Sequence, residues 1–413
     1  MLIKFALRHN LIYPLLLIIC QFIRQEVVII LAKSFEFGSS LAYIPLAFSG
    51  EFLGGLLFYL LQKLSFKRKR AEKDHYFMSI KLIQDKAKNG LAPADNYFKI
   101  AFLIFVTTFI DLAQYIYWAV TIPKFQNIST TLTQRTIGLS TIAVAIYYIY
   151  LLKLSIYKHH IFSLIVIGIC LVIILGSEFL FQKYDIFLSI GEFFTALALI
   201  IFKHICAPLV DLLEKYLFEY DYMNPFLVLM FEGLIGIVIS CLSCLNHNYF
   251  DDFKLAIKKN EGWDLVLFIF LIIFYIILSA LRNSLKMITT KIYSPMIRNL
   301  TDNVLTPLYF VVNFFVGSDL QYEKRNYLYF TINLILSLII LFSSFIYSEF
   351  IVLFCCGLET NTHDQISKRA AMFGFGSIYE LEKIDGESEA SDNYSSHTDN
   401  ETERTECGPF VLY

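Results

Sequence analysis

Ten apolar stretches, each about as long as a membrane helix, restrict the fold of this 413-residue sequence more than any other feature. A helix needs about 20 mostly apolar residues to cross a hydrocarbon core of about 30 Å. The stretches lack the alternation of barrel strands, and in lipid their backbone groups must be satisfied within the segment. The sequence therefore predicts an all-α, polytopic membrane protein with about ten transmembrane helices, near 11–32, 39–62, 98–122, 133–153, 160–177, 186–208, 226–245, 264–282, 295–316 and 328–350.

The composition excludes a water-soluble globular protein. Hydrophobic residues make up 57% of the chain and charged residues 17%, whereas soluble domains carry about 25% charge. Forty Phe and 26 Tyr would leave far more exposed apolar surface than soluble monomers tolerate. We therefore expect a lipid bilayer around the chain, and no nucleic acid partner.

Basic residues indicate how the helices are oriented. The longest basic segment is the predicted loop 63–97, and Lys and Arg concentrate on the cytoplasmic side of membrane proteins. With this loop in the cytosol, an even number of helices places both termini there. Two further predicted loops then lie on the same side; they contain Lys153, Lys158, His159 and His160, and Arg282, Lys286 and Lys291.

The chain divides into two halves of five predicted helices, 1–180 and 186–350, followed by a tail, 351–413. STTLTQRT places Arg135 at the start of the fourth predicted helix of the first half, and SPMIRNLT places Arg298 at the start of the fourth of the second. An odd number of helices per half gives the halves opposite orientations, as in the inverted repeats of transporters. The tail holds twelve Asp and Glu against four Lys and Arg, so we expect it to be acidic, cytosolic and largely disordered.

Ionisable residues inside the predicted helices are the candidates for function. Each costs at least about 2.5 kcal/mol near the bilayer centre, so it normally faces a wet cavity or a partner. Pairing and snorkelling are the structural alternatives for individual residues. The set consists of Arg24, Glu26, Glu51, Asp111, Arg135, Glu192, Lys203, Glu232, Arg298 and Asp302.

The stretch 295–316 is the most polar of the ten. Arg298 and Asp302 are four residues apart and share one helical face, and Asn303 adds an amide. Arg298 could hold a phosphate or carboxylate of a substrate, or it could form an ion pair that locks the bundle. We predict a substrate site formed by Glu26, Asp111, Arg135, Glu232, Tyr293, Ser294, Arg298, Asp302 and Asn303.

A second motif follows the sixth predicted helix, where EKYLFEYDYMNPFLVLMFEGLIGIV runs from Glu214 to Val238. The two glycines permit close helix packing or a hinge, Pro225 should begin or end a helix, and Glu214 and Lys215 could form a solvated ion pair. The residues with these structural roles are Glu214, Lys215, Asn224, Pro225, Gly233 and Gly236.

These motifs resemble the drug/metabolite transporter superfamily, in particular the F-type subgroup of the nucleotide-sugar-transporter-like solute carriers. In those proteins a Glu-Lys pair ends the sixth helix, an Asn-x-x-Pro or similar turn follows, and the seventh helix opens with Glu-Gly-x-x-Gly. A Ser-x3-Arg-x3-Asp-x3-Thr pattern is matched by Ser294, Arg298, Asp302 and Thr306. Leu305 stands where the relatives often have a second Arg, and Thr136 where they have Gly, which puts the shared substrate in doubt. The resemblance implies ten helices in two inverted repeats and solute exchange in Golgi, vacuolar or lysosomal membranes.

Together these features predict a secondary transporter or exchanger of a small, polar, anionic metabolite across an endomembrane. A receptor or scaffold without transport is the alternative, followed by a membrane enzyme. No P-loop, HExxH or phosphate-binding Gly-rich loop is present, so we expect neither catalysis, nor a cofactor, nor a metal. The sequence leaves open whether the protein forms a homodimer.

Overall fold

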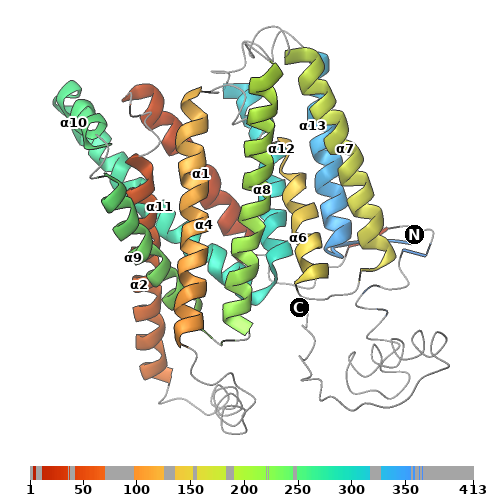
Figure 1. Cartoon of the computed structure of the whole chain (residues 1–413), viewed down its shortest axis with the longest axis horizontal. Helices are drawn as coiled ribbons and strands as arrows, with labels where there is room; N and C mark the ends of the chain where they lie inside the picture. Colours follow the sequence, from red (N-terminus) through yellow and green to blue (C-terminus); the bar gives the residue numbers. More distant parts are fainter. Residues whose placement is uncertain are drawn as a thin grey trace.

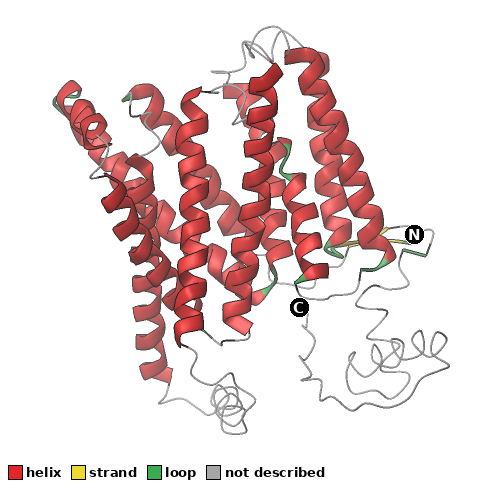
Figure 2. Cartoon of the chain, in the orientation of Figure 1, coloured by secondary structure: helices red, strands yellow, loops and turns green. Residues whose placement is uncertain are grey.

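The part of the chain that the computed structural model describes is almost entirely helical (Figures 1 and 2). The structure describes residues 3–5, 12–35, 37, 42–69, 97–124, 135–151, 156–182, 190–219, 221, 223–244, 249–316, 327–354, 357–358, 362 and 365. In this part of the chain the helices are α1 (Ile12–Ser34), α2 (Tyr43–Lys69), α4 (Tyr97–Lys124), α6 (Gly138–Tyr150), α7 (Lys158–Gln182), α8 (Ile190–Glu219), α9 (Pro225–Cys244), α10 (Tyr249–Lys259), α11 (Trp263–Ile292), α12 (Pro295–Val316) and α13 (Tyr327–Tyr347).

Every one of the ten predicted stretches lies on one of these helices, and the short helix α10 is additional. Among the described residues, seven helices are long and apolar enough to cross a membrane: α1, α2, α4, α7, α9, α11 and α13. Helix α6 is apolar but spans only 13 residues. Helices α8 and α12 have the length and carry several charged residues. The chain is thus an all-α protein with the helices of a multi-pass membrane protein.

The distribution of side chains suits a lipid environment. Large apolar side chains such as Leu57, Ile165 and Phe270 are more than half exposed on the outer faces of α2, α7 and α11. Charged side chains such as Glu51, Glu214 and Lys286 are buried. In water this arrangement would be reversed, so the outer surface is one that a bilayer would cover.

Packing joins helices that are far apart in sequence. Successive long helices alternate in direction, and α10 lies at the opposite end of the bundle from the two short strands (Figure 1). The strands β1 (Ile3–Phe5) and β2 (Ile351–Leu353) pair antiparallel, with Ile3 opposite Leu353. The main packed pairs are α2 with α9 and α11, α1 with α11 and α12, α4 with α8 and α9, α6 with α7 and α8, and α13 with α7 and α12.

Two helix starts follow from local capping chemistry. The Asn224 side chain accepts a hydrogen bond from the Phe226 backbone N–H (2.9 Å), and α9 begins at Pro225, as the sequence predicted. The Ser294 hydroxyl accepts one from the Ile297 N–H (3.2 Å), and α12 begins at Pro295. Both prolines stand at a first helical position, where the backbone N–H that proline lacks would have no partner within the helix.

Candidate functional site

A buried lysine contacts two carboxylates between α8 and α11. Lys286 Nζ on α11 lies 2.7 Å from Glu214 Oε1 and 3.2 Å from Asp211 Oδ1, both on α8. Glu214 is fully buried, and its Oε2 has no hydrogen-bond partner among the described residues. One ammonium group therefore contacts two carboxylates in the interior.

Arg298 on α12 forms the second cationic contact. Its Nη1 lies 2.5 Å from Asp302 Oδ2, one turn further along the helix, and its Nε lies 3.9 Å from Asp211 Oδ2. The longer distance exceeds a hydrogen bond, and Arg298 Nε has no hydrogen-bond partner within the described part of the chain. The face that the sequence predicted for Arg298 and Asp302 is thus formed, and the two residues are paired.

Hydrogen bonds extend this site towards the first helices. Gln21 on α1 donates to Asp302 (3.2 Å) and accepts from Arg282 Nε (2.9 Å). Arg282 also donates to Asn283 (2.5 Å), which donates to Glu51 on α2 (3.0 Å). We call the connected set the central polar chain; it consists of Glu51, Asn283, Arg282, Gln21, Asp302, Arg298, Asp211, Lys286 and Glu214.

The central polar chain connects α1, α2, α8, α11 and α12, and so both halves of the sequence. Its ionisable members are four carboxylates and three cations, all in a region from which water is largely excluded. Ion pairs join Lys286 to Asp211 and Glu214, and Arg298 to Asp211 and Asp302, which lowers the cost of burying these charges.

Three further predicted site residues lie on α1, α4 and α9. Glu232 on α9 is buried and accepts a hydrogen bond from Thr107 on α4 (2.7 Å). Asp111 on α4 accepts one from Gln114 (3.0 Å), and Glu26 is half-buried on α1. The bonds of Glu232 and Asp111 are separate from the central polar chain.

Another polar cluster lies between α6, α12 and α13. The Asn303 amide donates to Thr141 (3.0 Å) and to Ser344 (2.8 Å), and the Asn299 amide donates to Thr141 (2.8 Å). Asn303, predicted beside Asp302 in the substrate site, thus joins α12 to α6 and α13.

Arg135 is distant from Arg298. It is buried just before α6, donates to the Tyr329 hydroxyl at the start of α13, and lies 4.9 Å from the centre of that ring. Because α12 runs from Arg298 towards the connection to α13, Tyr329 lies at the other end of the bundle. The two arginines with matching sequence contexts therefore occupy opposite ends.

Glu214 and Lys215, near the end of α8, do not have the arrangement that the sequence suggested. These residues do not form a solvated pair with each other; both are buried and have different partners, since neighbouring helical residues point apart. Lys215 Nζ lies 2.6 Å from Glu219 and donates to the backbone oxygens of Lys291 (3.1 Å) and Tyr293 (3.4 Å). Tyr293 is itself buried at the α11–α12 turn.

Sequence reasoning missed five members of the central polar chain. It ended two helices too early, at 208 and 282, whereas α8 continues to Glu219 and α11 to Ile292. It therefore placed Arg282 and Lys286 in a cytosolic loop. The polar residues in these extensions are buried against one another, which apolar periodicity does not detect. The missed residues are Gln21, Asp211, Arg282, Asn283 and Lys286.

The predicted glycines lie at a close contact between α2 and α9. A Cβ atom on Gly233 would collide with the backbone N of Phe52, and one on Gly236 with the ring of Phe48. On the facing helix, a Cβ on Gly55 would lie 2.5 Å from the Met230 backbone N. Close approach of the two backbones therefore requires glycine at these positions.

The side chain of Glu192, most of the basic segment 63–97 and most of the acidic tail 351–413 lie outside the described residues. No family model matches the sequence, and no curated protein matches it either.

Proposed function

We propose that the protein is a secondary transporter or exchanger of a small, polar, anionic metabolite, working by alternating access across an endomembrane. The observation that carries the proposal is the central polar chain. A bundle that only anchors or scaffolds gains little from seven ionisable groups in its interior, of which five are buried and Arg282 and Asp302 partly buried, because apolar side chains of similar size would stabilise it equally or better. Intramembrane charges that face one another mark solute or ion pathways.

The packing of the helices supports two related halves. If α1, α2, α4, α6 and α7 are matched in order with α8, α9, α11, α12 and α13, exchanging the two sets turns one packed pair into another. The pair α2–α11 becomes α9–α4, α1–α11 becomes α8–α4, and α6–α8 becomes α12–α1. The pairs α2–α9 and α7–α13 exchange with themselves. Matched helices also run in opposite directions (Figure 1), as an inverted repeat requires.

The packing of the two halves differs in one set of three helices, and the proposal explains this difference. Helices α8, α11 and α12 pack on one another around Lys286 and Arg298, whereas no comparable packing joins α1, α4 and α6 in the described part of the chain. A protein that alternates between two states should close one of these triplets at a time. The ion pairs then hold the α8–α11–α12 end closed in this conformation.

An anionic substrate would act on this closure directly. By binding Lys286 and Arg298 it takes the place of Asp211 or Glu214, which weakens the contact between the helices. Binding energy is thereby converted into a change of conformation, which is the requirement for a ligand to shift an equilibrium. The resemblance of the motifs around Glu214, Glu232 and Arg298 to nucleotide-sugar-transporter-like solute carriers suggests a nucleotide sugar or a similar anion as the first class to test.

The test is uptake by purified protein in liposomes, with a panel of labelled nucleotide sugars, nucleotides, carboxylates and amino acids. We expect saturable uptake of at least one anion, accelerated by unlabelled substrate inside the liposomes if the protein is an exchanger. Arg298→Ala should reduce this uptake at least tenfold, and Lys258→Ala, on the exposed face of α10, should leave it unchanged. Absence of uptake across the panel by correctly folded protein would favour a receptor or scaffold.

A further inference from the structure

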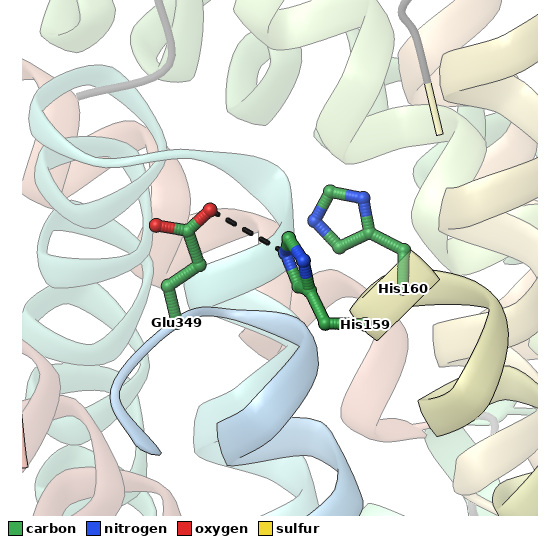
Figure 3. A group of neighbouring side chains, drawn as sticks. All are labelled: His159, His160 and Glu349. Carbon is green, nitrogen blue, oxygen red and sulfur yellow. Dashed lines mark ion pairs between the residues drawn. The ribbon is translucent and has the colours of Figure 1, made fainter. Parts of the chain in front are cut away.

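Two histidines and a glutamate meet at the end of the bundle where α7 begins and α13 ends (Figure 3). His159 and His160 lie in the first turn of α7, and Glu349 follows the last turn of α13. One ligand atom from each residue lies within 4.8 Å of the others. His159 Nε2 and Glu349 Oε1 are 3.4 Å apart.

His159 is placed as a ligand rather than as a surface residue. Its side chain is 3% exposed, and Nδ1 has no hydrogen-bond partner among the described residues. Its ring centre lies 4.0 Å from that of His160, which in turn lies 4.6 Å from the Tyr347 ring. A buried imidazole normally has a partner for each nitrogen, so this site is under-satisfied by the protein alone.

Glu349 occupies a backbone conformation that favours glycine. Its φ is 57°, the Phe350 N–H donates to Phe345 O (3.0 Å), and the Glu349 N–H donates to Ile346 O (3.1 Å). These bonds define a Schellman motif with Glu349 at the position usually taken by Gly. A residue with a side chain is disfavoured there, so its presence calls for a compensating interaction of the carboxylate.

From this geometry we propose that His159, His160 and Glu349 bind a divalent transition metal ion of the Zn²⁺ class. Two imidazoles and a carboxylate are ligands that Zn²⁺ accepts at 2.0 to 2.2 Å. Ligands at such distances in a tetrahedron are about 3.4 Å apart, which is the separation of His159 Nε2 and Glu349 Oε1. A fourth position is left for water or another ligand.

His160 must change one contact to complete the site. Its Nδ1 accepts a hydrogen bond from the Tyr157 backbone N–H at 3.3 Å, a long distance for such a bond. Nδ1 can exchange this donor for the metal, or the proton can move from Nε2 to Nδ1 and free Nε2. Either change moves only the ring and the turn before α7.

The bound ion would connect α7 of the first half to α13 of the second. These helices already pack along their length. A metal at their ends would make this pair a fixed unit of the bundle. The inference does not depend on transport, because it uses residues outside the central polar chain.

The experiment uses full-length protein purified in detergent through a tag without histidines, with its cysteines alkylated and bound metal removed by a chelator. Zn²⁺ is titrated against a competing fluorescent chelator, and the melting temperature is measured with and without Zn²⁺. We expect one Zn²⁺ per chain to bind and to raise the melting temperature. Glu349→Gly and His159→Gln should weaken this binding at least tenfold, whereas Glu261→Gln, at the other end of the bundle, should not.

Glu349→Gly separates a lost ligand from a damaged fold. Glycine suits the φ of Glu349, so the metal-free variant should melt at or above the temperature of the metal-free wild type. Loss of Zn²⁺ binding in such a variant supports the site even if His159→Gln fails to fold. Equal Zn²⁺ affinity and stoichiometry in wild type and Glu349→Gly would overturn the proposal.

Discussion

Lys286 on α11 and Glu214 on α8 are joined over 2.7 Å close to the ends of their helices, and the side chains of both are buried. The pair fastens two helices that the sequence alone would have ended before these residues. Lys215 adds to the same closure through the backbone oxygens at the α11–α12 turn. The end of the bundle formed by α8, α11 and α12 is therefore held by charge as well as by apolar packing.

Removing one partner of this pair should destabilise the protein strongly. Lys286→Met leaves Asp211 and Glu214 buried without their cation, and such losses cost about 3 to 5 kcal/mol. Thermal or denaturant unfolding in detergent measures the effect. Lys258→Met, on an exposed part of α10, serves as the control and should stay within about 0.5 kcal/mol of the wild type. The double variant with Glu214→Gln should regain part of the loss; no recovery would mean that the two residues are not coupled.

Two adjacent threonines on α4, Thr107 and Thr108, allow the hydrogen bond to Glu232 to be tested against a hydrogen bond within the helix. Each hydroxyl donates to the backbone oxygen of Ile104 in the same helix (2.8 Å), and the Thr107 hydroxyl also donates to Glu232 (2.7 Å). Thr107→Val should lower stability by about 1 to 3 kcal/mol, because a buried carboxylate loses its donor. Thr108→Val should have a much smaller effect, since that oxygen keeps its helical bond. Similar losses for both variants in the same unfolding assay would argue against the Glu232 contact.

The contact between α2 and α9 should not tolerate an added methyl group. Gly55→Ala would place a Cβ 2.5 Å from the Met230 backbone N, and overpacking of this kind costs about 1 to 3 kcal/mol. Gly168 on α7 provides the matched control, because a Cβ there meets no atom within 4 Å. Gly168→Ala should be neutral or stabilising by up to about 1 kcal/mol, since alanine favours the helix. Melting temperatures of the two variants would contradict this packing if they shifted in the same direction.

Chemical labelling can determine the orientation in the membrane. Lys158 begins α7 at the end of the bundle that holds the two strands, and Lys258 lies on α10 at the other end (Figure 1). With the basic segment 63–97 in the cytosol, Lys158→Cys should react with an impermeant maleimide from the cytosolic side only. Lys258→Cys should react only after the membrane is opened, in a background without the eight native cysteines. Reaction of both from one side would show that the assigned arrangement of helices is wrong.

The fold was more predictable from the sequence than the candidate site. Long apolar runs place the helices because lipid requires length and hydrophobicity, and α12 begins and ends where they predicted, at 295 and 316. Arg298 and Asp302 were found because four-residue spacing places them on one face. Lys286 and Asp211 were not, because they lie beyond the apolar part of α11 and α8. Their burial depends on residues far away in the sequence.

The same limit applies to His159, His160 and Glu349. Two neighbouring histidines before an apolar run resemble part of a basic loop, so the sequence predicted a cytosolic loop at these positions. The carboxylate that completes the group comes from the other half of the chain. It lies in a turn with a left-handed backbone, and because this position is occupied by Glu349 and not by glycine, the sequence does not indicate the turn. Only the pairing of α7 with α13 brings the three residues together.

The strand pair sets an order of events during synthesis. Residues Ile3–Phe5 precede α1 and leave the ribosome before their partner Ile351–Leu353, which follows α13. At roughly 5 to 20 residues per second, β1 waits on the order of tens of seconds for its partner. The pairing of β1 with β2 can therefore form only after α13 has been made, and it joins the segment before α1 to the segment after α13.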